Sequence, residues 1–179
     1  HNPFENKNFL KNFYNKSLLK GDVIICNSYF VKDYIERKYS PSKKIIPIVR
    51  GIDVSYFKDI KKKEVKNLKN FVLFNPSRVT KWKGQLNLLK QFLHFENNLK
   101  NQITLKFISN HSSKYELELD NFIKKNSLSS KVIFEKPTNE IKKLYLNSDI
   151  VINSSINPEG FGRTISESLA LNIPAIGPN

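Results

Sequence analysis

Two glycines and two glutamates lie close together near the C-terminal end of the sequence, in an order that could bind a ligand. Gly160 and Gly162 permit backbone conformations closed to other residues and let a ligand approach the main-chain amides. A helix that begins near Arg163 leaves its first amide groups unpaired, which favours an anion such as a phosphate there. Glu159 and Glu167 would repel a bare anion, but they can accept hydrogen bonds from sugar hydroxyls. The pattern therefore indicates a site for a sugar phosphate.

The same residues have a simpler interpretation, which is a turn between a strand and a helix. In that interpretation Glu159 caps the helix and Glu167 lies on its solvated face. The elements that position the two glutamates decide between these alternatives.

Short apolar runs alternate with apolar residues at helical spacing along the chain. The runs predict strands over residues 22–26, 44–49, 71–74, 103–108, 132–134, 150–152 and 174–176. The helical spacing predicts helices over residues 5–20, 29–39, 86–93, 115–123, 141–146, where Tyr145 is one of the apolar positions, and 163–171. Strands that alternate with helices form a parallel sheet with helices on both faces. We therefore predict an α/β fold with a doubly wound, Rossmann-like parallel sheet.

The Lys-rich residues 57–70 interrupt this alternation, and we predict a linker or the first exposed helix of a new unit there. In the unit that follows, the strands at 71–74 and 150–152 should be neighbours, because the strand order reverses between them. Ligands bind beyond the carboxyl ends of such strands. The loop after the first of these strands brings Arg78 and Lys83 to this edge. A planar guanidinium and a mobile ammonium suit two linked phosphates.

Composition limits the other classes of function. A net charge of +14 and a pI near 9.8 are typical of nucleic-acid binding. However, only four of the 30 cationic residues are Arg, the preferred reader of phosphates and bases. We attribute the excess of Lys to drift in an AT-rich genome and expect no nucleic acid as a partner. A basic nucleic-acid-binding module remains the alternative from another class.

The sequence also carries signals about compartment. No apolar run approaches the about 20 residues that a membrane span needs, and the N-terminus lacks the layout of a signal peptide. Cys26 is the only cysteine and follows an apolar run, so we expect a buried, reduced thiol. These features lead us to expect a soluble cytoplasmic protein, with the inner face of the membrane as the alternative location.

Five motifs in this order resemble the retaining family-4 glycosyltransferases of the GT-B architecture. They are Asp22-Val23-Ile24-Ile25 with Asn27-Ser28, Gly51-Ile52-Asp53 with Phe57, Ser77-Arg78 with Lys83-Gly84, Glu159-Gly160-Phe161-Gly162, and Glu167 eight positions after Glu159. The resemblance covers nearly the whole chain and implies a hexosyltransferase type of enzyme that uses a nucleotide sugar.

The resemblance also implies a role for each matching residue. Arg78 and Lys83 would hold the donor diphosphate and stabilise its charge as it leaves. Glu159 would contact hydroxyls of the donor sugar, and Glu167 those of the ribose. The sugar and phosphate would also lie against residues at the start of the helix, namely Gly160, Phe161, Gly162, Arg163 and Thr164. No metal or other cofactor is implied.

Three further residues match the family less closely. Lys136 and Pro137 fall where the family contacts the nucleobase, but the common glycine is missing, so the base stays open. His1 falls roughly where the family keeps a histidine near the reacting sugar.

The resemblance divides the chain into residues 1–60, the end of an acceptor-side domain, and residues 61–179, a donor-binding domain truncated at its C-terminus. We expect such a fragment to bind nucleotide sugar weakly and not to turn over. The implied partners are a nucleotide sugar and a glycan, lipid-linked or other acceptor. The usual setting of such enzymes is envelope polysaccharide or lipopolysaccharide assembly, with peripheral membrane contact.

Two alternatives besides the nucleic-acid module stay open. A glycosidase also needs two carboxylates, but here both lie beside a phosphate-type site and no third acid is available. A non-catalytic domain could instead keep the same fold as a nucleotide-binding scaffold.

Overall fold

The computed structural model describes residues 9–58, 70–96, 102–110 and 112–178. These residues fall into two compact units. The first holds the described part of His1–Ile52 together with Asn157–Gly162, and the second holds that of Asp53–Ile156 and Arg163–Asn179. The predicted boundary between residues 60 and 61 lies outside the described residues, as does most of the predicted linker.

The first unit begins with helix α1 (Phe9–Ser17) and the single-turn η1 (Leu18–Lys20), and then forms a two-stranded parallel sheet. Strand β1 (Val23–Cys26) pairs in parallel with β2 (Lys44–Pro47). Helix α2 (Tyr29–Tyr39) connects the two strands. Strands β1 and β2 and helix α2 were expected from the apolar pattern, and the single helix predicted over residues 5–20 contains α1 and η1. A parallel pair requires a crossover such as α2.

The core of the first unit is small and apolar. Its buried members come from both strands and from α2, namely Ile24, Cys26, Val31, Ile35 and Ile45. Removal from water raises the pKa of the Cys26 thiol above its usual value. The prediction of a buried Cys26 is confirmed.

The second unit contains a five-stranded sheet, and every recorded strand pair in it is parallel. The strand order is β5-β4-β3-β6-β7. The strands are β3 (Asn70–Arg78), β4 (Gln102–Ile108), β5 (Val132–Glu135), β6 (Ile150–Ile152) and β7 (Ala175–Ile176). The predicted neighbours, β3 and β6, are paired, so the prediction of a doubly wound parallel sheet is confirmed.

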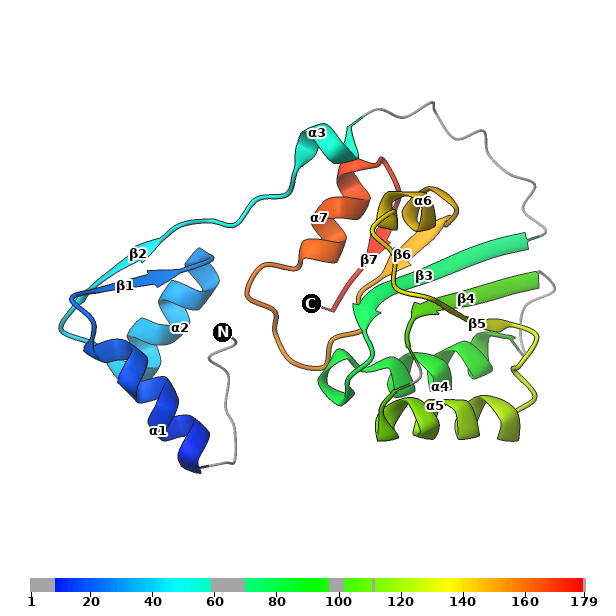
Figure 1. Cartoon of the computed structure of the whole chain (residues 1–179), viewed down its shortest axis with the longest axis horizontal. Helices are drawn as coiled ribbons and strands as arrows, with labels where there is room; N and C mark the ends of the chain where they lie inside the picture. The colour runs from blue at the N-terminus through cyan, green and yellow to red at the C-terminus, as the bar shows by residue number, and fades with distance from the viewer. Residues whose placement is uncertain (1–8, 59–69, 97–101, 111, 179) are drawn as a thin grey trace. The chain divides into compact units, whose positions relative to one another are not determined.

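Helices cover both faces of this sheet. They are α3 (Val54–Phe57), the single-turn η2 (Lys81–Lys83), α4 (Gln85–Glu96), α5 (Lys114–Lys125), α6 (Ile141–Leu146) and α7 (Arg163–Ala170). Figure 1 shows α4 and α5 side by side on one side of the sheet, and α6 and α7 on the other. No helix in the described part of the chain is long and apolar enough to cross a membrane.

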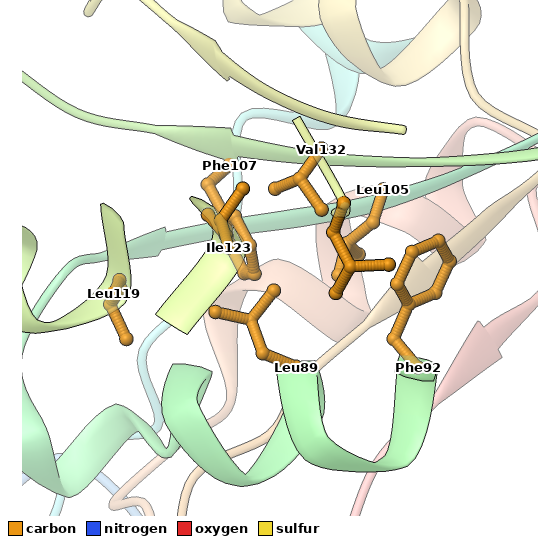
Figure 2. Close-up of a cluster of buried hydrophobic side chains, with 8 residues drawn as sticks. Leu89, Phe92, Leu105, Phe107, Leu119, Ile123 and Val132 are labelled. Atoms are coloured by element: carbon orange, nitrogen blue, oxygen red, sulfur yellow. The ribbon is translucent and has the colours of Figure 1, made fainter. Parts of the chain in front are cut away.

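Alternation along the strands decides which residues reach each face. Leu105 and Phe107, two positions apart on β4, join the cluster under α4 and α5. Figure 2 shows them with Leu89 and Phe92 of α4. Phe74 of β3 contacts Tyr145 of α6 instead, on the opposite face, with the ring centroids 5.4 Å apart. Leu73, next to Phe74 on β3, packs against the first cluster, so both faces of β3 are covered, as expected for a doubly wound sheet.

Candidate functional site

The loops that follow β3 and β6 touch one another. The backbone N–H of Ile156 donates to the backbone oxygen of Trp82 at 2.9 Å. The hydroxyl of Ser154 donates to the backbone oxygen of Lys83 at 2.7 Å. Two segments about 70 positions apart in sequence are thus held together at the carboxyl ends of neighbouring strands. This is the position at which doubly wound sheets bind ligands.

Gly84 allows this close approach. It has a φ of 70°, in the left-handed region that favours glycine. A Cβ atom at this position would lie only 2.1 Å from the backbone oxygen of Ser154. Any other residue would push the two loops apart.

A buried amide also links the two strand ends. The Nδ2 group of Asn75, which is fully buried, donates to the backbone oxygen of Ile152 at 2.9 Å and to Oγ of Ser154 at 3.0 Å. Pro76 follows Asn75 in β3 and has no N–H for the sheet. The register between β3 and β4 also shifts between Asn75 and Arg78. The Asn75 side chain therefore joins β3 to the end of β6 and its loop just beyond the last recorded pair of these strands, Phe74 with Val151.

The two predicted cations lie on the β3 loop in different surroundings. Arg78 is exposed at the end of β3, and its backbone oxygen accepts a hydrogen bond from Nε2 of Gln85 at 2.9 Å. Lys83 is only 9% exposed, and its ammonium lies 4.3 Å from the centroid of the Trp82 ring. A cation this close to an indole face is attracted by it. The Lys83 ammonium is therefore held against the Trp82 ring, whereas the Arg78 side chain faces solvent.

The start of α7 contains the second group of predicted residues. Nε of Arg163 donates to Oε1 of Glu167 at 2.6 Å. The carboxylate of Glu167 is buried, and its Oε2 accepts a hydrogen bond from the Tyr145 hydroxyl at 2.7 Å. The buried hydroxyl of Thr164 has no hydrogen-bond partner within the described residues. Glu167 thus does not lie on a solvated helix face, which removes the simpler interpretation of this residue.

Burial strongly raises the pKa of the Tyr145 hydroxyl, and the nearby Glu167 carboxylate raises it further. The Tyr145 hydroxyl therefore keeps its proton near neutral pH and donates it in the hydrogen bond to Glu167.

Residues Asn157–Gly162, which we call the Glu159 loop, belong to the first unit. A Cβ atom at Gly160 would lie 3.1 Å from Oδ1 of Asn27 and 3.3 Å from a methyl group of Val31. Gly160 therefore packs closely where β1 turns into α2. Gly162 has a φ of 73°, and Glu159 and Phe161 are half-buried.

The remaining predicted residues lie apart from these groups. Lys136 and Pro137 are exposed directly after β5. His1 lies outside the described residues. In the described part of the chain, no group of three His, Cys, Asp or Glu residues could hold a metal ion.

Three residues of the site carry no sequence signal of their role. Helical apolar spacing identifies Tyr145 as a core residue, and nothing in the sequence connects its hydroxyl with Glu167, 22 positions away. Asn75 and Ser154 likewise meet only in the folded sheet. Trp82 is different, since it is next to Lys83 in the sequence and is the only tryptophan.

Comparison with known proteins decides the family. The family model of glycosyl transferases group 1 matches residues 57–179. The chain belongs to the group 1 glycosyl transferases. The matched region includes the β3 loop with Arg78 and Lys83, the Glu159 loop, and α7 with Glu167.

Similar proteins support the same family. This group 1 glycosyl transferase is 28% identical over 176 residues to the uncharacterized glycosyltransferase MJ1069 of Methanocaldococcus jannaschii. The matched region covers 92% of this chain and 44% of that protein. It also resembles the crystal structure of a glycosyltransferase from Rickettsia africae ESF-5, with 27% identity and a TM-score of 0.76 over 97% of this chain and 48% of the other.

A third similar protein, Anabaena Alr3699/HepE, was crystallised with UDP and glucose. It is 22% identical, with a TM-score of 0.74 over 94% of this chain and 47% of that one, and this likeness concerns the fold alone. The predicted GT-B type of fold is confirmed by these structures. The chain spans less than half the length of each of the three relatives.

Proposed function

We propose that the protein is a retaining glycosyltransferase of family 4, which transfers a hexosyl group from a nucleotide-diphosphate donor to an acceptor hydroxyl. Membership in the group 1 glycosyl transferases supports transfer of a sugar. The UDP and glucose bound to the similarly folded Anabaena protein support a nucleotide-sugar donor. The order of the five sequence motifs supports retention of configuration at the sugar.

The observation that carries this proposal is the contact between the β3 and β6 loops. Arg78 and Lys83 lie on the β3 loop, and hydrogen bonds connect this loop to the segment that leads into α7. The first amide groups of a helix have no acceptor within that helix, so the start of α7 favours an anion. Two cations and a helix N-terminus at the ends of neighbouring strands suit the diphosphate of a donor.

The proposed chemistry follows from where charge develops. The bond between the anomeric carbon and the diphosphate oxygen breaks, the acceptor oxygen bonds to that carbon, and the proton of the acceptor hydroxyl passes to the departing diphosphate. Negative charge accumulates on the leaving diphosphate. Arg78 and Lys83 stabilise this charge and thereby lower the barrier to transfer. We propose that they take the charge-neutralising role that Mg²⁺ has in other phosphate sites.

The other predicted residues complete the proposed site. Glu159 accepts hydrogen bonds from the donor sugar and Glu167 from the ribose, while Lys136 and Pro137 contact the nucleobase. The acceptor is a glycan or a lipid-linked molecule at the inner face of the membrane, in envelope polysaccharide or lipopolysaccharide assembly. The motif resemblance supports these assignments.

A thermal-shift panel tests the proposal. UDP-, GDP- and ADP-sugars are added to the full-length protein in EDTA, and at least one is expected to raise the unfolding midpoint by several degrees. A ligand at 100 times its Kd stabilises the folded state by about 2.7 kcal/mol. Arg78→Ala is expected to remove most of this shift.

Arg37→Ala is the matched control, because Arg37 is an exposed arginine on α2. It should leave the shift unchanged. The proposal fails if no donor stabilises the wild type, or if both variants respond to the donors as the wild type does.

A further inference from the structure

The only described hydrogen bond of the Tyr145 hydroxyl joins α6 to α7. Tyr145 is fully buried and Glu167 is 6% exposed, and the distance from the hydroxyl to Oε2 is 2.7 Å. Arg163 reaches the other carboxylate oxygen, Oε1, at 2.6 Å. Each oxygen of Glu167 therefore has its own donor.

Two donors on opposite oxygens fix the plane of the carboxylate. A carboxylate offers about four acceptor positions, so two remain for other donors. Rotation of the carboxylate would break both existing hydrogen bonds at once. A buried charged group that loses its hydrogen-bond partner destabilises the folded state. The two remaining positions thus have a defined direction.

The tyrosine ring is itself held by aromatic neighbours on two elements. Phe74 of β3 meets it edge to face, with the rings at 82° and their centroids 5.4 Å apart. Phe57 of α3 meets it at 90° and 6.2 Å, and Phe57 is only 3% exposed. Such edge-to-face pairs are favourable. The ring can therefore not move away from Glu167 without disturbing the core.

Phe57 also links this arrangement to a sequence motif that the proposed function leaves unused. It ends the short helix α3, whose first turn is capped by Asp53, since a carboxylate oxygen of Asp53 accepts a hydrogen bond from the N–H of Tyr56 at 3.0 Å. The motif at residues 51–57 thus places an aromatic side chain directly behind Tyr145.

We propose that Tyr145, supported by Phe57, is a positioning residue that directs the free acceptor positions of Glu167 toward the ribose hydroxyls of the donor. This inference rests on the proposed function, in which Glu167 binds the ribose. Tyr145 itself does not touch the donor.

A comparison of two ligands with two variants tests this inference. Binding of a ribonucleoside diphosphate and of its 2′-deoxy counterpart is measured by calorimetry with the full-length wild type and with Tyr145→Phe. The wild type should bind the ribose ligand about tenfold more tightly, because the deoxy ligand lacks one hydrogen bond to the charged Glu167. Tyr145→Phe should lose most of this preference, and its affinity for the deoxy ligand should stay within about twofold of the wild type.

Two further variants make the result specific. Glu167→Gln is expected to lose the ribose preference as well. Tyr56→Phe removes a hydroxyl from an exposed tyrosine of α3 and should keep the preference.

The possible outcomes separate the two proposals. A wild type that binds neither ligand, or both equally, would overturn the ribose role of Glu167 and the role of Tyr145 together. A wild type that prefers ribose, with a Tyr145→Phe variant that does so equally, would overturn the role of Tyr145 alone. An equal loss of affinity for both ligands in Tyr145→Phe would show a merely structural tyrosine and would also overturn it.

Discussion

Replacing Gly84 by alanine is expected to lower the unfolding midpoint of the protein by roughly 10 °C. A non-glycine residue in the left-handed region costs about 1–2 kcal/mol, and the φ of Gly84 is 70°. The new Cβ would also meet the Ser154 backbone oxygen, 2.1 Å away, which cannot rotate aside as a side chain can. Overpacking of this kind costs about 1–3 kcal/mol. Together these effects amount to about 3 kcal/mol, measurable by thermal or urea unfolding.

Two other glycines separate the two causes. Gly162 has a similar φ of 73°, but an added Cβ would meet no atom within 4 Å beyond its neighbours in the chain, so Gly162→Ala should show the backbone cost alone. Gly51 has neither feature, and Gly51→Ala should unfold close to the wild type. A Gly84→Ala protein as stable as Gly51→Ala would contradict the close approach of the β3 and β6 loops.

Lys83→Met is expected to reduce kcat for sugar transfer by about 100-fold, the effect of losing one preorganised group that stabilises developing charge. Methionine keeps the unbranched apolar stem of lysine and most of its length but has no charge. Because the Lys83 ammonium lies over Trp82, the wild-type cation is held in place before the reaction. The measurement is the initial rate of the full-length enzyme at saturating donor.

The neighbouring Lys81→Met is the matched control. Lys81 is exposed and lies 3.8 Å from a carboxylate oxygen of Glu118. Exposed ion pairs of this kind contribute little to the stability of a protein. This variant should keep its rate within about twofold of the wild type. Equal losses in the two variants would show that net charge on the loop, and not Lys83, supports the reaction.

The course of the chain was predictable because it depends on local patterns. The strands around Phe74 and Val151 are short apolar runs. They are neighbours because the strand order of a doubly wound sheet reverses between them. The same rule places the loops after β3 and β6 at one edge of the sheet. The positions of Arg78 and Lys83 at this edge follow from the same pattern.

The internal contacts of the site were not predictable in this way. The spacing of Tyr145 is that of a core residue, and its bond to Glu167 depends on how α6 and α7 pack side by side. The amide of Asn75 similarly finds its partners only because β3 and β6 are adjacent. Such hydrogen bonds connect separate elements through a side chain, and no periodicity in the sequence predicts them.

The central claim is that Arg78 and Lys83 hold the diphosphate of a nucleotide donor. Calorimetric titration of the full-length protein with a nucleoside, its monophosphate and its diphosphate tests this claim most directly. We predict that affinity rises with each phosphate, and that Arg78→Ala and Lys83→Met each lose most of the gain from the second phosphate. Equal affinity for all three ligands, or a gain that both variants keep, would contradict the account.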